Sequence, residues 1–172
     1  MQAAHALGLA LYSYANDNNG LYPDASSSTE AFQQLLDGGY ISDPTILYVA
    51  MDGKTKAFKD QKKLRPENVC WDITAGASKE DSGSLPLLFL TGYRITYTPG
   101  SDAVPEIKPF PAYRLNNSWF ADLSNPGIAA YYVDNHAVWL LAQGNLIPHF
   151  VPQNFDAQGK TYRQLTPDGV LR

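Results

Sequence analysis

The stretch LGLALYSYANDNNG, residues 7–20, contains the clearest helix signal of the chain and the clearest helix stop. Apolar side chains recur here with the 3.6-residue period of one helix face: Ala3, Leu7, Ala10, Leu11 and Tyr14. Residues 16–20 then supply Asn, Asp and Gly, which tolerate the left-handed backbone of a helix C-terminus. No capping residue precedes the stripe. We therefore expect a helix over residues 1–19 that is truncated on its N-terminal side.

Residues 20–84 are predicted to be a loop region with one short helix. Ser27 and Glu30 have the spacing of a capping box, and Gly38-Gly39 would end the helix that follows. Residues 46–49 indicate a short strand or extended passage. Residues 52–84 are polar and interrupted, and within them Gly76 and residues 78–84 favour surface loop.

Residues 85–172 carry the strand signals and a C-terminal tail. Residues 85–90 are apolar and residues 93–97 alternate, as strands do. Residues 128–133 and 136–141 predict a hairpin closed by Asp134-Asn135 as a two-residue type I′ turn.

That turn pairs Tyr131 with Val138 and Ala130 with Trp139. The tail, residues 143–172, contains further turn signals and could add edge strands. The whole layout predicts a single α+β domain over residues 1–172, in which a long N-terminal helix packs on an antiparallel sheet of about three to five strands.

Charge and cysteine content exclude several classes of function. The 172-residue chain has a net charge of −4, which argues against nucleic acid as a partner. Its one basic cluster, residues 54–65, is interpreted as a solvated loop or short helix face, with contact to lipid headgroups or a partner as the alternative. Cys70 is the single cysteine, so no internal disulfide can form, and we expect it to be buried.

Two stretches resemble bacterial type IV pilin-like proteins, in particular pseudopilins of type II secretion. Residues 7–23 look like the second half of the pilin spine helix and the loop that leaves it. Residues 131–139, YYVDNHAVW, are similar to the Phe-Ala-Asp-Gly-His-Val hairpin near the end of such proteins. The chain departs from the family at Asn135, where Gly is usual, and at Ala50-Met51, where a Cys-Pro pair is often found.

The resemblance implies a pilin-like fold and a role in assembly rather than catalysis. The chain would be a subunit or minor subunit of a type IV pilus or a secretion pseudopilus, with other pilin or pseudopilin subunits as partners. It implies that Ala3, Leu7, Leu11 and Tyr14 serve helix packing and assembly. It also implies an apolar helix before Gln2 that anchors the full-length form in the inner membrane. The domain would then face the periplasm or the cell exterior.

A different class of function is a cell-surface adhesin or carbohydrate-binding module, in which Trp119 would stack on a ligand. The sequence identifies no host or glycan partner. We do not expect an enzyme, because no nucleophile motif accompanies the histidines and Asp134 and His136 share a face only loosely across their turn.

No cofactor is expected. Residues 16–20 invite a calcium interpretation, but Ala15 stands where an EF-hand loop needs its first oxygen ligand. Calcium near Asp122, Asn125 and Asp134 is left open as an alternative.

Overall fold

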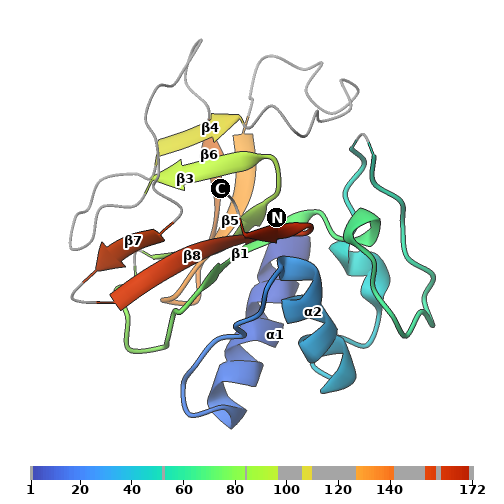
Figure 1. Ribbon diagram of the computed structural model, residues 1–172, viewed down its shortest axis with the longest axis horizontal. Coiled ribbons are helices and arrows are strands. Elements are labelled where there is room, and N and C mark those ends of the chain that lie inside the picture. The colour runs from blue at the N-terminus through green and yellow to red at the C-terminus, as the bar shows by residue number, and fades with distance from the viewer. Residues whose placement is uncertain are drawn as a thin grey trace.

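The fold is α+β, with two helices packed against a large antiparallel sheet in a computed structural model. The structure describes residues 2–51, 53–83, 85–96, 106–109, 127–141, 154–157 and 160–170. Figure 1 shows α1 and α2 together on one side of the large sheet, with the small sheet of β3 and β4 on the far side. Helix α1 contacts β5, β2 and β6, while α2 contacts β1 and β8.

Helix α1 spans Gln2–Asp17, and its sixteen residues make it shorter than the long helix we expected. Its buried residues recur at helical spacing: Ala4, Leu7, Gly8, Ala10, Leu11 and Ala15. At the N-terminal end the buried residue is Ala4, one position after Ala3 of the predicted stripe. The predicted stop is confirmed. Asn19 and Gly20 have φ of 56° and 80°, and the Gly20 amide donates to the Ala15 carbonyl at 2.7 Å.

Helix α2 spans Ser28–Asp37 and is capped as predicted at Ser27, whose hydroxyl accepts from the Glu30 amide at 3.1 Å. The return half of the capping box is different. The Glu30 carboxylate accepts from the amide and the hydroxyl of Ser26, at 3.2 and 2.7 Å, rather than from Ser27. Gly38 caps the helix end and Gly39 follows with φ of 78°, which confirms the predicted termination.

Two short 3₁₀ helices occupy the loop region. The first, η1, spans Pro44–Leu47, where the sequence suggested an extended passage. Asp43 starts it, because its carboxylate accepts from the Thr45 amide at 3.0 Å and Pro44 suits a first helical position. The second, η2, spans Pro66–Asn68.

Within the described residues the main sheet has seven antiparallel strands, more than the three to five we predicted, in the order β6-β5-β2-β1-β8-β7 with β9 also paired to β8. The bounds of its strands are β1 Trp71–Ala75, β2 Pro86–Leu90, β5 Gly127–Tyr132, β6 Ala137–Leu141, β7 Asn154–Ala157, β8 Lys160–Thr166 and β9 Gly169–Val170. A separate pair joins β3, Tyr93–Thr96, to β4, Glu106–Pro109.

Strands β1 and β8 form the middle of the sheet, and the sequence interpretation missed their importance. No strand was predicted over residues 71–75, which lie in the stretch described as polar and interrupted, yet all five are buried between β2 and β8. The two polar residues of the segment, Asp72 and Thr74, are both buried and hydrogen-bonded inside the fold. Strand β8 pairs with β1 and also with β7 and β9, so the tail is not confined to a sheet edge.

The hairpin of β5 and β6 is present, but the predicted register is wrong by one residue. Tyr131 pairs with Ala137 and Ala129 pairs with Trp139. The Tyr132 amide donates to the His136 carbonyl, so the loop has three residues, of which Asn135 has φ of 71°. Val133 is excluded from the hairpin ladder because its amide donates to the Leu85 carbonyl at 3.1 Å.

Among the described residues, no helix combines the length and the apolar character needed to cross a bilayer.

Candidate functional site

The four predicted assembly residues lie on the inner side and flanks of α1. Leu7 and Leu11 are fully buried against the sheet, while Ala3 and Tyr14 are partly buried. The Tyr14 hydroxyl donates to Gln34 Oε1 at 3.2 Å, and its ring meets Tyr40 edge-on at a centroid distance of 5.4 Å. Tyr14 therefore ties α1 to α2 and the turn that follows it.

The closest approach of α1 to the sheet is at Gly8, which lies over the ring of Tyr131. A Cβ atom built on Gly8 would come within 2.3 Å of that ring. The Tyr131 hydroxyl donates to Asn135 Oδ1 in the hairpin loop, so one side chain joins helix, strand and turn. Burial, and then the nearby Asp134 carboxylate, raises the pKa of Tyr131 to about 12, which keeps the phenol protonated.

The opposite face of α1 is solvent-exposed and recurs at the same helical period: Gln2, His5, Ala6, Leu9, Ser13 and Asn16. We call this set the outer face of α1. Leu9 is the notable member, because a large apolar side chain is 41% exposed at its centre.

The outer face of α1 leads at its N-terminal end into a hollow of about 530 Å³ beside the β5–β6 turn. Gln2, His5, Asn135, His136 and Ala137 line the hollow. The ring of His136 stacks on Tyr132 at 4.7 Å, and its Nδ1 contacts Asp134 Oδ1. The prediction that Asp134 and His136 share a face only loosely is therefore wrong.

This hollow holds an imidazole oriented by a carboxylate. Among the described residues that line it, none is a serine or a cysteine that could act as the nucleophile of a triad. The cysteine of the chain, Cys70, is fully buried elsewhere, as expected, and burial raises the pKa of its thiol. The arrangement suits a surface contact better than acyl transfer.

A second polar site is buried in the sheet around Asp72. Its Oδ2 accepts from Gln164 Nε2 at 2.7 Å, and the buried Thr91 hydroxyl lies beside the same carboxyl group. Burial raises the pKa of Asp72 to about 7. Sequence reasoning missed this site, because Asp72 lies in a stretch for which no strand was predicted.

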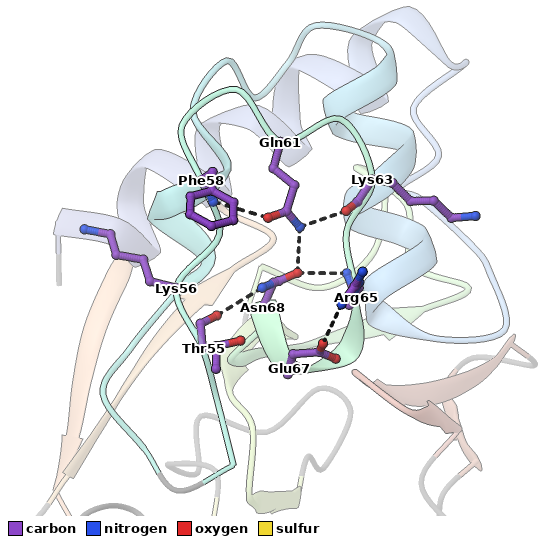
Figure 2. Close-up of a pocket in the computed structure, with 8 residues that line it drawn as sticks. All are labelled: Thr55, Lys56, Phe58, Gln61, Lys63, Arg65, Glu67 and Asn68. Carbon is purple, nitrogen blue, oxygen red and sulfur yellow. Dashed lines mark hydrogen bonds and ion pairs between the residues drawn. The ribbon is translucent and has the colours of Figure 1, made fainter.

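The third site is the loop of residues 53–68, which encloses a hollow of about 690 Å³ (Figure 2). Residues from both arms of the loop line it: Thr55, Lys56, Phe58, Gln61, Lys63, Arg65, Glu67 and Asn68. This loop contains the basic cluster that composition had singled out. What the sequence did not reveal is the exposure of Phe58, which is 77% accessible.

Metal and ligand expectations fall partly outside the described residues. Trp119, the predicted stacking residue, lies there, as do Asp122 and Asn125, the proposed calcium ligands with Asp134. Across the described ranges, no group of three or more His, Cys, Asp or Glu side chains is placed to hold a metal ion.

Comparison of the chain with protein-family models, with curated proteins and with solved structures gives no match.

Proposed function

We propose that the chain is the water-facing domain of a pilin-like subunit, of a type IV pilus or a secretion pseudopilus, and that it acts by assembly with other subunits. In this proposal the full-length form is anchored in the inner membrane, and the domain faces the periplasm or the cell exterior. No bond chemistry is required of it.

The observation that carries the proposal is the two-sided character of α1. Its inner face is fixed to the sheet by Leu7, Leu11 and the close contact of Gly8 with Tyr131. Its outer face leaves Leu9 exposed. A helix that is attached to its own domain along one side and exposes a large apolar side chain on the other can pack that side chain against a neighbouring helix.

Two further features support the proposal. The element order, a first helix, a short second helix and then an antiparallel sheet ending in a hairpin, is the one the resemblance led us to expect. The hairpin motif of residues 131–139 lies beside the start of α1, where Gln2 and His5 share a hollow with His136. The two stretches that carry the resemblance are in contact, because Gly8 lies over the ring of Tyr131.

The reading frame that encodes the natural protein tests the class directly. The proposal predicts that it continues upstream of Gln2 with a prepilin peptidase site and an apolar helix of about 20 residues, in phase with α1. A natural protein that starts at Met1 would overturn the proposal.

Crosslinking tests the assembly surface itself. In full-length protein with Cys70→Ala, a Leu9→Cys substitution should give crosslinked multimers in the cell envelope. Leu21→Cys is the matched control, because Leu21 is also an exposed leucine, at 56%, but lies outside the helix. Equal crosslinking of the two variants would contradict a specific role for the outer face of α1.

A further inference from the structure

The loop of residues 53–68 concentrates positive charge in an acidic protein. Residues 53–67 contain six Lys or Arg and two Asp or Glu, a net charge of +4, whereas the whole chain has −4. The remainder of the chain therefore carries −8. Within the loop five cations are exposed: Lys56, Lys59, Lys62, Lys63 and Arg65.

One large apolar side chain stands among these cations. Phe58 is 77% exposed, more than Leu9 or Leu21, the other exposed large apolar residues of the described chain. It is flanked by Lys56 and Lys59 in the sequence. An exposed ring surrounded by lysines is typical of segments that rest at a lipid–water interface, where the ring is buried and the ammonium groups meet headgroups.

The loop is held in shape by a buried asparagine at its centre. Asn68 is 5% exposed; its Oδ1 accepts from Gln61 Nε2 and the Arg65 amide, at 2.7 and 3.0 Å, and its Nδ2 donates to the Thr55 carbonyl. Gln61 Oε1 in turn accepts from the Phe58 amide at 3.2 Å. The backbone that presents the ring is therefore ordered before any partner binds, which lowers the entropic cost of binding.

A second attachment fixes the loop to the body of the protein through Gln33 on α2. Gln33 Nε2 donates to the Lys62 carbonyl at 2.9 Å, and its Oε1 accepts from the Leu64 amide at 2.8 Å. The basic loop and helix α2 thus form one surface.

The hollow inside this loop is poorly suited to a small ligand. Both Nε2 hydrogens of Gln61 are already donated, one to Asn68 and one to the Lys63 carbonyl, so its amide has no donor left for a ligand. Figure 2 shows Lys56 and Lys63 pointing away from the centre in opposite directions. Small-molecule sites have polar groups that converge. Here the charges are spread, as binding to an extended anionic surface requires.

We propose that the loop of residues 53–68 docks on the surface of a bilayer that contains anionic lipids. Phe58 enters the interface, and the exposed cations contact headgroup phosphates. The net charge of −8 on the rest of the chain is repelled by the same surface, so binding is oriented through this loop. A protein partner is less well supported, because the core of a protein interface needs several apolar side chains and the loop exposes one. The inference rests on this loop alone and does not depend on the proposed function.

Vesicle flotation of the purified 172-residue chain tests the proposal. We expect binding to phosphatidylcholine vesicles that contain about a third phosphatidylglycerol, no binding to pure phosphatidylcholine, and release as ionic strength approaches ~1 M. Phe58→Ala should weaken binding roughly tenfold. Lys56→Gln with Lys63→Gln should weaken it roughly twentyfold, since each cation near the surface contributes about a fivefold factor.

Matched controls separate this loop from general surface effects. Leu21→Ala removes an exposed apolar side chain elsewhere, and Lys79→Gln removes a positive charge outside the loop. Both should bind vesicles as the wild type does, and all variants should keep the wild-type circular dichroism spectrum. The proposal is overturned if the wild type does not float at low salt, if it binds neutral vesicles equally, or if the controls lose as much as the loop variants. Binding to polyglutamate without binding to vesicles would assign the loop to an acidic protein and also overturn it.

Discussion

Gly8 on α1 lies so close to Tyr131 on β5 that a Cβ atom built on the glycine would fall 2.3 Å from the aromatic ring. Tyr131 is 1% exposed, and its hydroxyl donates to Asn135 at the tip of the hairpin. A glycine inside a helix costs about 1 kcal/mol relative to alanine, so its presence here is explained by the packing it permits. This contact sets how closely the helix can approach the sheet.

Gly8→Ala should therefore destabilise the fold in spite of the better helix propensity of alanine. We expect a loss of about 1–3 kcal/mol, because the new methyl group has to displace a buried ring. For a domain of this size, this lowers the Tm by roughly 3–10 °C in thermal unfolding. Ser13→Ala, an exposed change on the same helix, serves as the control and should leave the Tm nearly unchanged. A Gly8→Ala protein as stable as the wild type would show that the helix does not rest on Tyr131.

Asp72→Asn should make stability less dependent on pH. Burial raises the pKa of Asp72 from 3.8 to about 7, so between about pH 4 and 7 the folded chain retains a proton that the unfolded chain has released. The contribution of Asp72 is therefore greatest at low pH and is lost as pH rises through this window. Asparagine stays neutral and can still accept from Gln164.

The measurement is the difference in Tm between Asp72→Asn and the wild type as a function of pH. It should be small near pH 4 and grow to roughly 8–16 °C in favour of the variant at pH 8. A difference that stays constant with pH would mean that Asp72 has an ordinary pKa.

Substitutions at Asn135 test the three-residue hairpin loop. Asn135 has φ of 71° and accepts a hydrogen bond from the Tyr131 hydroxyl. Asn135→Gly keeps the left-handed backbone and loses only the acceptor, whereas Asn135→Ala loses both. We expect losses in unfolding free energy of about 0.5–1 kcal/mol for glycine and about 1–2 kcal/mol for alanine. The reverse order in denaturant unfolding would contradict the loop geometry.

Local signals in the sequence predicted the helix ends correctly, because those ends depend on neighbouring residues. Asn19 and Gly20 end α1, and Ser27 caps α2. The hairpin was also predicted, but its register was not, since the Val133 amide donates to the carbonyl of Leu85, the residue before β2. No property of the turn sequence alone reveals that contact.

The centre of the sheet could not be predicted for the same reason. Asp72 reads as a loop residue until Gln164, 92 positions away, is placed beside it. The basic loop was likewise predictable only in part. Its charge is visible in the sequence, but the exposed Phe58 and the buried Asn68 that supports the loop depend on the fold.

The central claim is that this domain works by assembly through the outer face of α1, and filament incorporation measures it most directly. Full-length protein carrying Leu9→Asp would be compared with wild type and with Leu21→Asp, a matched change at an exposed leucine outside the helix. The amount of each in the sheared filament fraction is the readout, normalised to total cellular protein. The account predicts that wild type and Leu21→Asp are incorporated and that Leu9→Asp stays in the cell envelope. Incorporation of Leu9→Asp into filaments at the wild-type level would contradict it.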